Sequence, residues 1–169
     1  MRYRATTCLI LLFVGKAVLA QEARPDLRQL LAEGRAIQPQ VAEGLQLVAE
    51  LEGAIERAFR ETGQLGDGSP GVGLAVDPAQ IRGTYVANIE VVGGTIVVTY
   101  GREADDRIAG RTLVITPYQN LAGEIWWRCA EALVPDGYTL LGTYRGTPVS
   151  LRHSTVSRAA LPKSCLPTF

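Results

Sequence analysis

Residues that metal centres and covalent catalysts need are scarce in this sequence. Only three cysteines and one histidine occur among its 169 residues. Cys129, Cys165 and His153 would leave a four-ligand zinc shell incomplete, and no carboxylate is placed to complete it. His153 precedes Ser154, but adjacent residues do not form a catalytic relay, and the Gly-x-Ser-x-Gly elbow is absent. We therefore expect no metal, no cofactor and no enzymatic activity.

An excess of charge of either sign is also missing. Seventeen basic residues balance seventeen acidic ones, which argues against a generally basic surface for nucleic acids and leaves a local patch open. Some carboxylates lie close together in the sequence, but none has the spacing of a metal or glycosidase pair. The glycine-rich stretch at 66–73 has no following P-loop lysine, so we interpret it as a connection.

Long apolar runs are absent as well. The first residues carry two arginines, an apolar run at 8–14, and small or apolar residues up to Ala20, where a signal peptidase would cut. Lys16 interrupts this run, which is well short of the roughly 20 residues that span a bilayer, so a permanent anchor is the weaker alternative. We expect residues 1–20 to be a cleaved export signal and 21–169 to be one domain, with no stable transmembrane anchor after cleavage.

The three cysteines predict one disulfide. Cys8 would leave with the export signal, so Cys129 and Cys165 would remain alone in an oxidising compartment. Their simple pairing would close a loop of about 37 residues. By chain-entropy arguments such a bridge stabilises the fold by about 3 to 4 kcal/mol.

Between Asp26 and Thr62, apolar residues recur at steps of three and four, which is the pattern of one face of an amphipathic helix. The stripe comprises Leu27, Leu30, Leu31, Ile37, Val41, Leu45, Val48, Leu51, Ile55 and Phe59. Charged residues in its first part exclude a membrane-spanning helix. We expect Pro39 to kink or restart the helix and Gly63 to end it. The pattern predicts a helix at about 27–62.

After the glycine-rich stretch the period of the pattern changes to two. The segments TYVANIEVV and TIVVTY flank Gly93 and Gly94, which predicts a hairpin because both glycines accept positive φ. RTLVITPY and EIWWRCA are two further predicted strands, and YTLLGTYRG could add a short hairpin or edge strand. The prediction is an α+β fold, in which the long N-terminal helix packs on an antiparallel sheet of about four strands at about 84–130.

Several of these segments together carry a family resemblance. They are AIQPQVAEGLQLVAELEGAIERAFRETGQ, the hairpin and third strand from Gly83 to Tyr118, and the cysteine segments IWWRC and LPKSC. In this order, over about residues 36–165, they resemble the head of a type IV pilin. The resemblance implies an αβ-roll in which the disulfide-bounded region 129–165 is presented to solvent.

The start of the chain departs from the pilin pattern. A prepilin has a short basic leader ending in glycine, followed by a phenylalanine-led apolar helix with glutamate at its fifth position. Here VLAQEARPDLRQLL occupies that place, so we carry over no anchoring, processing or filament-core residue. Two versions remain open: a pilus-associated subunit whose tail was lost or whose start lies upstream, and a soluble periplasmic module with a pilin head.

The region between the cysteines supplies a candidate partner surface. It contains four basic residues against two acidic ones, together with two tyrosines. Trp126 and Trp127 are neighbours on a predicted strand and therefore point to opposite faces, so we expect one in the core and the other to cap the sheet or face a partner. The candidate surface comprises Trp127, Tyr138, Tyr144, Arg145, Arg152, Arg158 and Lys163.

The resemblance implies a structural or adhesive protein of type IV pili or the cell surface. Its expected partners are other pilins, pilus-assembly components or a surface ligand, and its expected location is periplasmic, extracellular or pilus-associated. The alternative is a soluble periplasmic module that binds protein or DNA. DNA is the weaker ligand because four spaced cations are more often a solvated surface. An exported enzyme is weaker still, since no catalytic constellation is present.

Overall fold

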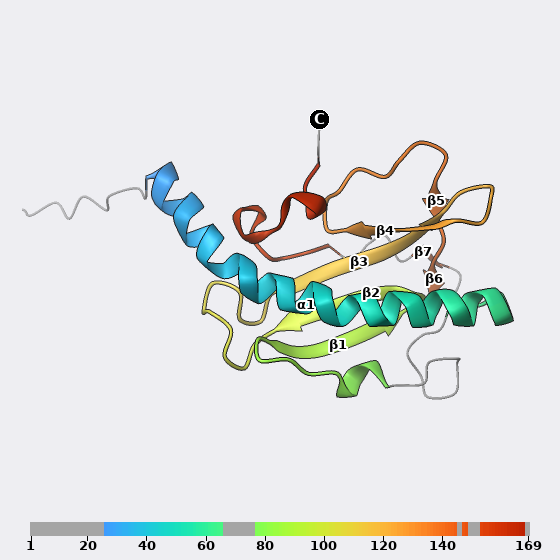
Figure 1. Cartoon of the computed structure of the whole chain (residues 1–169), viewed down its shortest axis with the longest axis horizontal. Helices are drawn as coiled ribbons and strands as arrows, with labels where there is room; N and C mark the ends of the chain where they lie inside the picture. Colours follow the sequence, from blue (N-terminus) through green and yellow to red (C-terminus); the bar gives the residue numbers. More distant parts are fainter. Residues whose placement is uncertain (1–25, 66–76, 145–146, 149–152, 168–169) are drawn as a thin grey trace, which may run out of the picture.

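A long helix lies across one face of an antiparallel sheet in the computed structural model, which describes residues 26–65, 77–144, 147–148 and 153–167 (Figure 1). This helix, α1 (Leu27–Thr62), begins at Asp26, whose carboxylate accepts a hydrogen bond from the Arg28 amide. It ends at Gly63, which has a φ of 70° and donates its N–H to the Phe59 carbonyl. The helix predicted at 27–62 and its glycine stop are confirmed.

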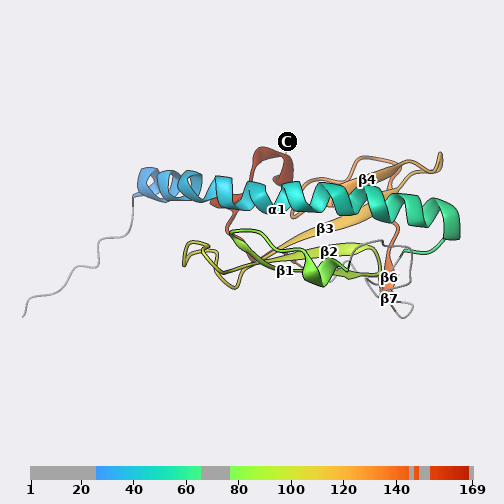
Figure 2. The same ribbon diagram turned by 60° about the horizontal axis from the view of Figure 1, so that its bottom comes forward.

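Pro39 does not divide α1 into two elements. The helix continues through this residue, and Figure 1 shows that its N-terminal part is inclined to the remainder. The N-terminal part extends beyond the sheet, and the following part lies along the strands (Figure 2). α1 therefore has a projecting half, which precedes Pro39, and a packed half, which follows it.

Four strands follow one another along the chain and in the sheet. They are β1 (Val86–Val92), β2 (Thr95–Tyr100), β3 (Thr112–Gln119) and β4 (Ile125–Cys129). The turn between β1 and β2 is formed by Gly93 and Gly94, with φ values of 54° and 79°, as the sequence predicts. Two short additions are β5 (Thr139–Leu140), which pairs with β3, and the separate hairpin of β6 (Thr143–Tyr144) and β7 (Thr147–Pro148).

Strand β3 changes partner halfway along one of its edges. On that edge β2 pairs with residues up to Ile115, and β5 pairs from Tyr118 onward. Pro117 lies between the two ladders, and its carbonyl accepts from the Leu141 amide. A proline in a central strand is tolerated there because its missing N–H falls where no ladder bond is required.

The core lies between α1 and the sheet face that it covers. Its largest buried side chains include Val41, Val48, Ile55, Ile89, Ile96, Val98, Tyr100, Leu113 and Ile115. Gly44 permits this close approach, because a Cβ there would come within 2.5 Å of the Tyr100 hydroxyl. That hydroxyl donates to the Val41 carbonyl at 3.0 Å. Burial, with a smaller contribution from the Glu43 carboxylate, raises the pKa of Tyr100 above its usual range.

Glu43 fastens α1 to the segment that enters β1. Its two carboxylate oxygens accept from the backbone amides of Thr84 and Tyr85, at 2.5 and 2.8 Å. Charge-assisted bonds of this kind are stronger than neutral ones. They fix the position of α1 relative to the segment that precedes β1.

The last described segment closes the sheet edge that β4 leaves open. Ser154 accepts from the Val114 amide at 2.9 Å, and Thr155 exchanges hydrogen bonds with Thr112. Two short 3-10 turns follow, η3 (Arg158–Ala160) against α1 and η4 (Lys163–Cys165) against β4. The C-terminal segment thus ties the sheet to the projecting half of the helix.

Candidate assembly and binding surfaces

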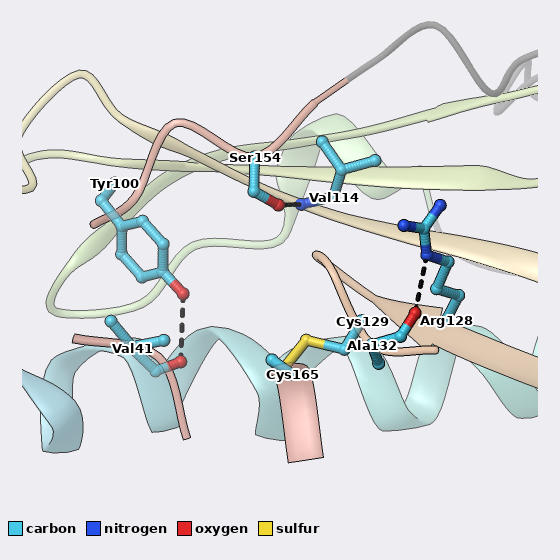
Figure 3. The surroundings of a disulfide bond; sticks show 8 residues. All are labelled: Val41, Tyr100, Val114, Arg128, Cys129, Ala132, Ser154 and Cys165. Atoms are coloured by element: carbon cyan, nitrogen blue, oxygen red, sulfur yellow. Dashed lines mark hydrogen bonds between the residues drawn. A yellow bond between two sulfur atoms is a disulfide. The ribbon is translucent and has the colours of Figure 1, made fainter. Parts of the chain in front are cut away.

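The predicted disulfide is present and joins the end of β4 to η4 (Figure 3). The Cα atoms of Cys129 and Cys165 are 4.6 Å apart, and Cys165 is fully buried. Beside the bridge, the Glu131 amide donates to the Cys165 carbonyl. The bridge therefore fixes the C-terminal segment against the sheet.

Basic residues of the candidate partner surface are only partly described. Arg158 is exposed, and its guanidinium lies 3.2 Å from the carboxylate of Glu131. Lys163 is exposed on η4. Arg145 and Arg152 lie outside the described residues, and so does any side-chain statement about Tyr144. The described residues therefore do not show whether the basic residues of the candidate partner surface lie together.

The two tryptophans of β4 point to opposite faces, as predicted from their adjacency. Trp127 faces α1, where its indole N–H donates to the Glu56 carboxylate at 2.9 Å. Trp126 lies on the outer face, in contact with Tyr118 and Tyr138. Of the two, Trp126 is the one placed beside an aromatic member of the candidate surface.

The three outer rings form an aromatic cluster of Tyr118, Trp126 and Tyr138. The ring centroids of Trp126 lie 6.3 Å from Tyr118 and 6.4 Å from Tyr138, and all three side chains are half-buried. Inclined pairs at this separation are favourable arrangements of aromatic quadrupoles. The cluster presents a neutral, partly apolar surface on the side of the sheet opposite the helix.

A carboxylate pair lies where α1 faces β4. Burial, and secondly the nearby Glu56 carboxylate, raises the pKa of Glu52 to about 7. Glu56 itself is held by Trp127 and lies 3.8 Å from Arg60. Ionisation of Glu52 near neutral pH therefore places a second negative charge one helical turn from Glu56.

An apolar groove of about 390 Å³ lies between the projecting half of α1 and η3. Its lining includes Leu27, Leu30, Leu31, Gly34, Ile37 and Ala160. The three leucines are 67, 43 and 45% exposed. On the rim, Arg107 pairs with Asp105 at 2.7 Å and with Glu33 at 3.5 Å.

A second cleft, of about 530 Å³, lies at the other end of α1. It is lined by Phe59 and Gly63 at the helix end, by Gln119 at the end of β3, and by Ala122 and Gly123 of the β3–β4 turn. The tip of this turn carries Leu121, whose side chain is fully exposed at 105% relative accessibility.

Neither the groove nor the exposed turn was identified from the sequence as a site. The leucines at 27, 30 and 31 belong to the predicted helical stripe, which predicts burial along its whole length. Their exposure follows because the helix outruns the sheet (Figure 1). Leu121 had one local signal, an apolar residue within the turn-rich QNLAG.

Comparison with known proteins assigns the family. Residues 38–166 match the model of the pilin family, which forms bacterial filaments. The chain belongs to this family, and its long helix, antiparallel sheet and C-terminal disulfide are those of a type IV pilin. It is 23% identical over 163 residues to the type IV major pilin protein PilE1 of Neisseria gonorrhoeae, covering 95% of this chain and 90% of that protein.

In the described part of the chain, no helix combines the length and apolar character required to cross a membrane. α1 has the length, with 36 residues, but charged side chains recur along it.

Proposed function

We propose that this protein is a structural subunit of a type IV pilus, which assembles with other pilins outside the cytoplasm. The family match over the head, together with the pilin fold, is the observation that carries this proposal. Its partners are then further pilins and the assembly components that handle them. The disulfide holds the C-terminal segment against the sheet of each subunit.

The test is to look for the chain in filaments. Pili sheared from cells that produce the protein should contain it when the filaments are purified and analysed by mass spectrometry, and a deletion strain should lack the signal. Purified filaments without this chain, from cells that contain it in quantity, would contradict a structural role.

Export and processing are part of the same proposal. Cleavage near Ala20 would give a mature chain that begins at Gln21, which forms one domain to residue 169. Intact mass should show this N-terminus and a gain of two hydrogens when the Cys129–Cys165 bridge is reduced. A mass that retains the first twenty residues would instead favour membrane tethering.

A second candidate function, surface adhesion or ligand binding, is favoured by the aromatic cluster. Tyr118, Trp126 and Tyr138 present half-buried rings on the face opposite α1. Such rings contribute large contact area at low entropic cost. Binding of the purified head to host or bacterial surfaces should fall in Trp126→Ala and persist in Leu133→Ala, a change at an exposed leucine outside the cluster.

DNA is tested separately because its recognition requires cations. Charge reversal at Arg145 and Arg152 should abolish binding of double-stranded DNA if the basic region is responsible. A salt-independent interaction, or one that survives the reversal in a folded protein, would exclude this mode.

A further inference from the structure

The β3–β4 turn presents the side chain of Leu121 to solvent. Asn120 organises the turn, since its side-chain oxygen accepts from the amides of Ala122 and Glu124 at 3.0 and 2.9 Å. The Asn120 side-chain amide donates to the Glu124 carboxylate at 2.7 Å. An apolar side chain on a pre-ordered turn loses little conformational entropy when it is buried by a partner.

The groove at the projecting half of α1 is a recess, whereas Leu121 protrudes from its turn. Its floor is close-packed, because a Cβ on Gly34 would come within 2.5 Å of the Ala159 carbonyl oxygen. Its walls are the partly exposed Leu30 and Leu31 on one side and η3 on the other. An aliphatic side chain suits the leucine-lined part of this recess, because the charged groups that also line it, Glu33 and Arg107, are already paired with each other.

The turn and the groove cannot meet within one molecule. The groove is lined by the first turns of α1, and the β3–β4 turn shares a cleft with the helix end near Phe59 and Gly63. From Gly34 to Phe59 a helix rises by roughly 40 Å. Figure 1 shows the first turns of α1 and the β3–β4 turn at opposite ends of the long axis.

We infer that Leu121 of one subunit inserts into the α1–η3 groove of the next copy of this chain. The inference rests on the proposed function, because it names a contact within the filament. Two observations favour a second copy as the occupant: the family forms bacterial filaments, and the turn and the first turns of α1 lie at opposite ends of the molecule.

The geometry of this contact has a direct consequence for assembly. Each copy uses two different surfaces, one at each end, so the contact is heterologous and leaves a free turn and a free groove at the ends of every oligomer. A contact of this kind propagates into an open chain unless its rotation closes a ring. It therefore adds a link along the helix axis to whatever other contacts hold the subunits.

Cysteine cross-linking in sheared filaments tests the inference. A chain that carries both Leu121→Cys and Leu30→Cys should give, on mild oxidation, a ladder of covalent oligomers that collapses on reduction. The control pairs Leu30→Cys with Gln80→Cys, since Gln80 is exposed on η1 (Pro78–Gln80) and belongs to neither feature. This control should give no ladder.

A second variant tests the energetic contribution. Leu121→Asp should lower the yield of sheared filaments by roughly 10-fold or more, because a buried leucine is replaced by a charge. The matched change Leu133→Asp, at a leucine that is 52% exposed, should leave the yield unchanged. Both variants should retain the thermal midpoint of the unmodified protein, since both side chains are exposed.

The outcomes separate this inference from the proposed function. Filaments that contain the chain but give no ladder, with normal yield from Leu121→Asp, would overturn the contact and leave the pilus subunit intact. An unmodified chain that never enters filaments would overturn the proposed function itself. If Leu30→Cys resists a thiol reagent in the purified monomer, the groove is already covered by the chain's own preceding residues, and the contact is refuted.

Discussion

At the scale of single residues, the most informative group is a carboxylate rather than a cysteine. Glu52 sits where α1 meets β4, and its pKa is raised to about 7 by burial and by the neighbouring Glu56. The sequence marks it only as one of several glutamates on a helix. Its environment depends on how far the helix rotates toward the sheet, which no local pattern specifies.

Glu52→Gln should reduce the loss of stability with rising pH. The native state holds the Glu52 proton up to about pH 7, whereas a carboxyl in the unfolded chain releases it near its ordinary value of 4.5. The native state thus binds more protons across this window, and the free energy of unfolding falls as pH rises through it. Thermal midpoints at pH 5 and pH 8 should differ less in Glu52→Gln than in the unmodified protein.

The control for this prediction is Glu61→Gln, a change at an exposed glutamate near the end of the same helix. It removes the same charge from the chain without removing a buried carboxyl. An identical pH profile in the two variants would mean that burial of Glu52 has no effect on stability.

At the scale of elements, two glycines of α1 have opposite roles. Gly34 lies against the Ala159 backbone, so an added Cβ would force η3 away from the helix. A Cβ at Gly53 would meet only the end of the Arg57 side chain, at 3.5 Å. The first glycine is required by packing between elements, and the second is not.

Alanine substitution should therefore change stability in opposite directions. Gly53→Ala should stabilise the protein by up to about 1 kcal/mol, because alanine is the better helix former. Gly34→Ala should destabilise it, since the helix propensity gained is outweighed by the displaced η3. Urea unfolding of the two variants measures both effects, and stabilisation by Gly34→Ala would contradict the close packing.

Which elements form could be predicted from the sequence, because the signals are local. Gly63 and the Gly93–Gly94 pair marked the end of the helix and the hairpin turn, and these positions are confirmed. The Cys129–Cys165 pairing followed from counting. The switch of β3 from β2 to β5 at Pro117 could not be predicted, because it depends on which distant segments reach each edge.

The candidate surfaces were less accessible to prediction for a related reason. Tyr138 was named from the sequence, but its contact with Trp126 requires the fold of the loop after β4. The α1–η3 groove needs the C-terminal segment to return to the helix, which composition does not reveal. Exposure of an apolar stripe is visible only once the length of the sheet beneath it is known.

At the scale of the whole molecule, the disulfide connects the sheet to the C-terminal segment that packs on the helix. It fixes η4 to β4, and through η3 the same segment covers α1. Replacing both Cys129 and Cys165 by alanine should lower the free energy of unfolding by about 3 to 4 kcal/mol. The free energy of unfolding of a domain is about 5 to 15 kcal/mol. A domain near the upper value would therefore stay folded without the bridge, and one near the lower value would be only marginally stable.

The variant should also show where the loss is concentrated. Hydrogen exchange should accelerate first at the amides of Thr155 and Val156, which lie on the segment that the bridge retains. Uniform acceleration throughout β1 and β2 would contradict a local role and indicate a bridge that acts only on the unfolded chain.

The contact between Gly34 and Ala159 has one more consequence, for the order of folding. These residues lie near opposite ends of the domain, so this contact has a very high sequence separation and forms at a late stage. During export, α1 and the hairpin can fold before η3 emerges, but the groove exists only after η3 has crossed. A chain whose η3 is still in transit therefore lacks the surface by which we expect it to join a neighbour, which delays association until η3 has packed on the helix.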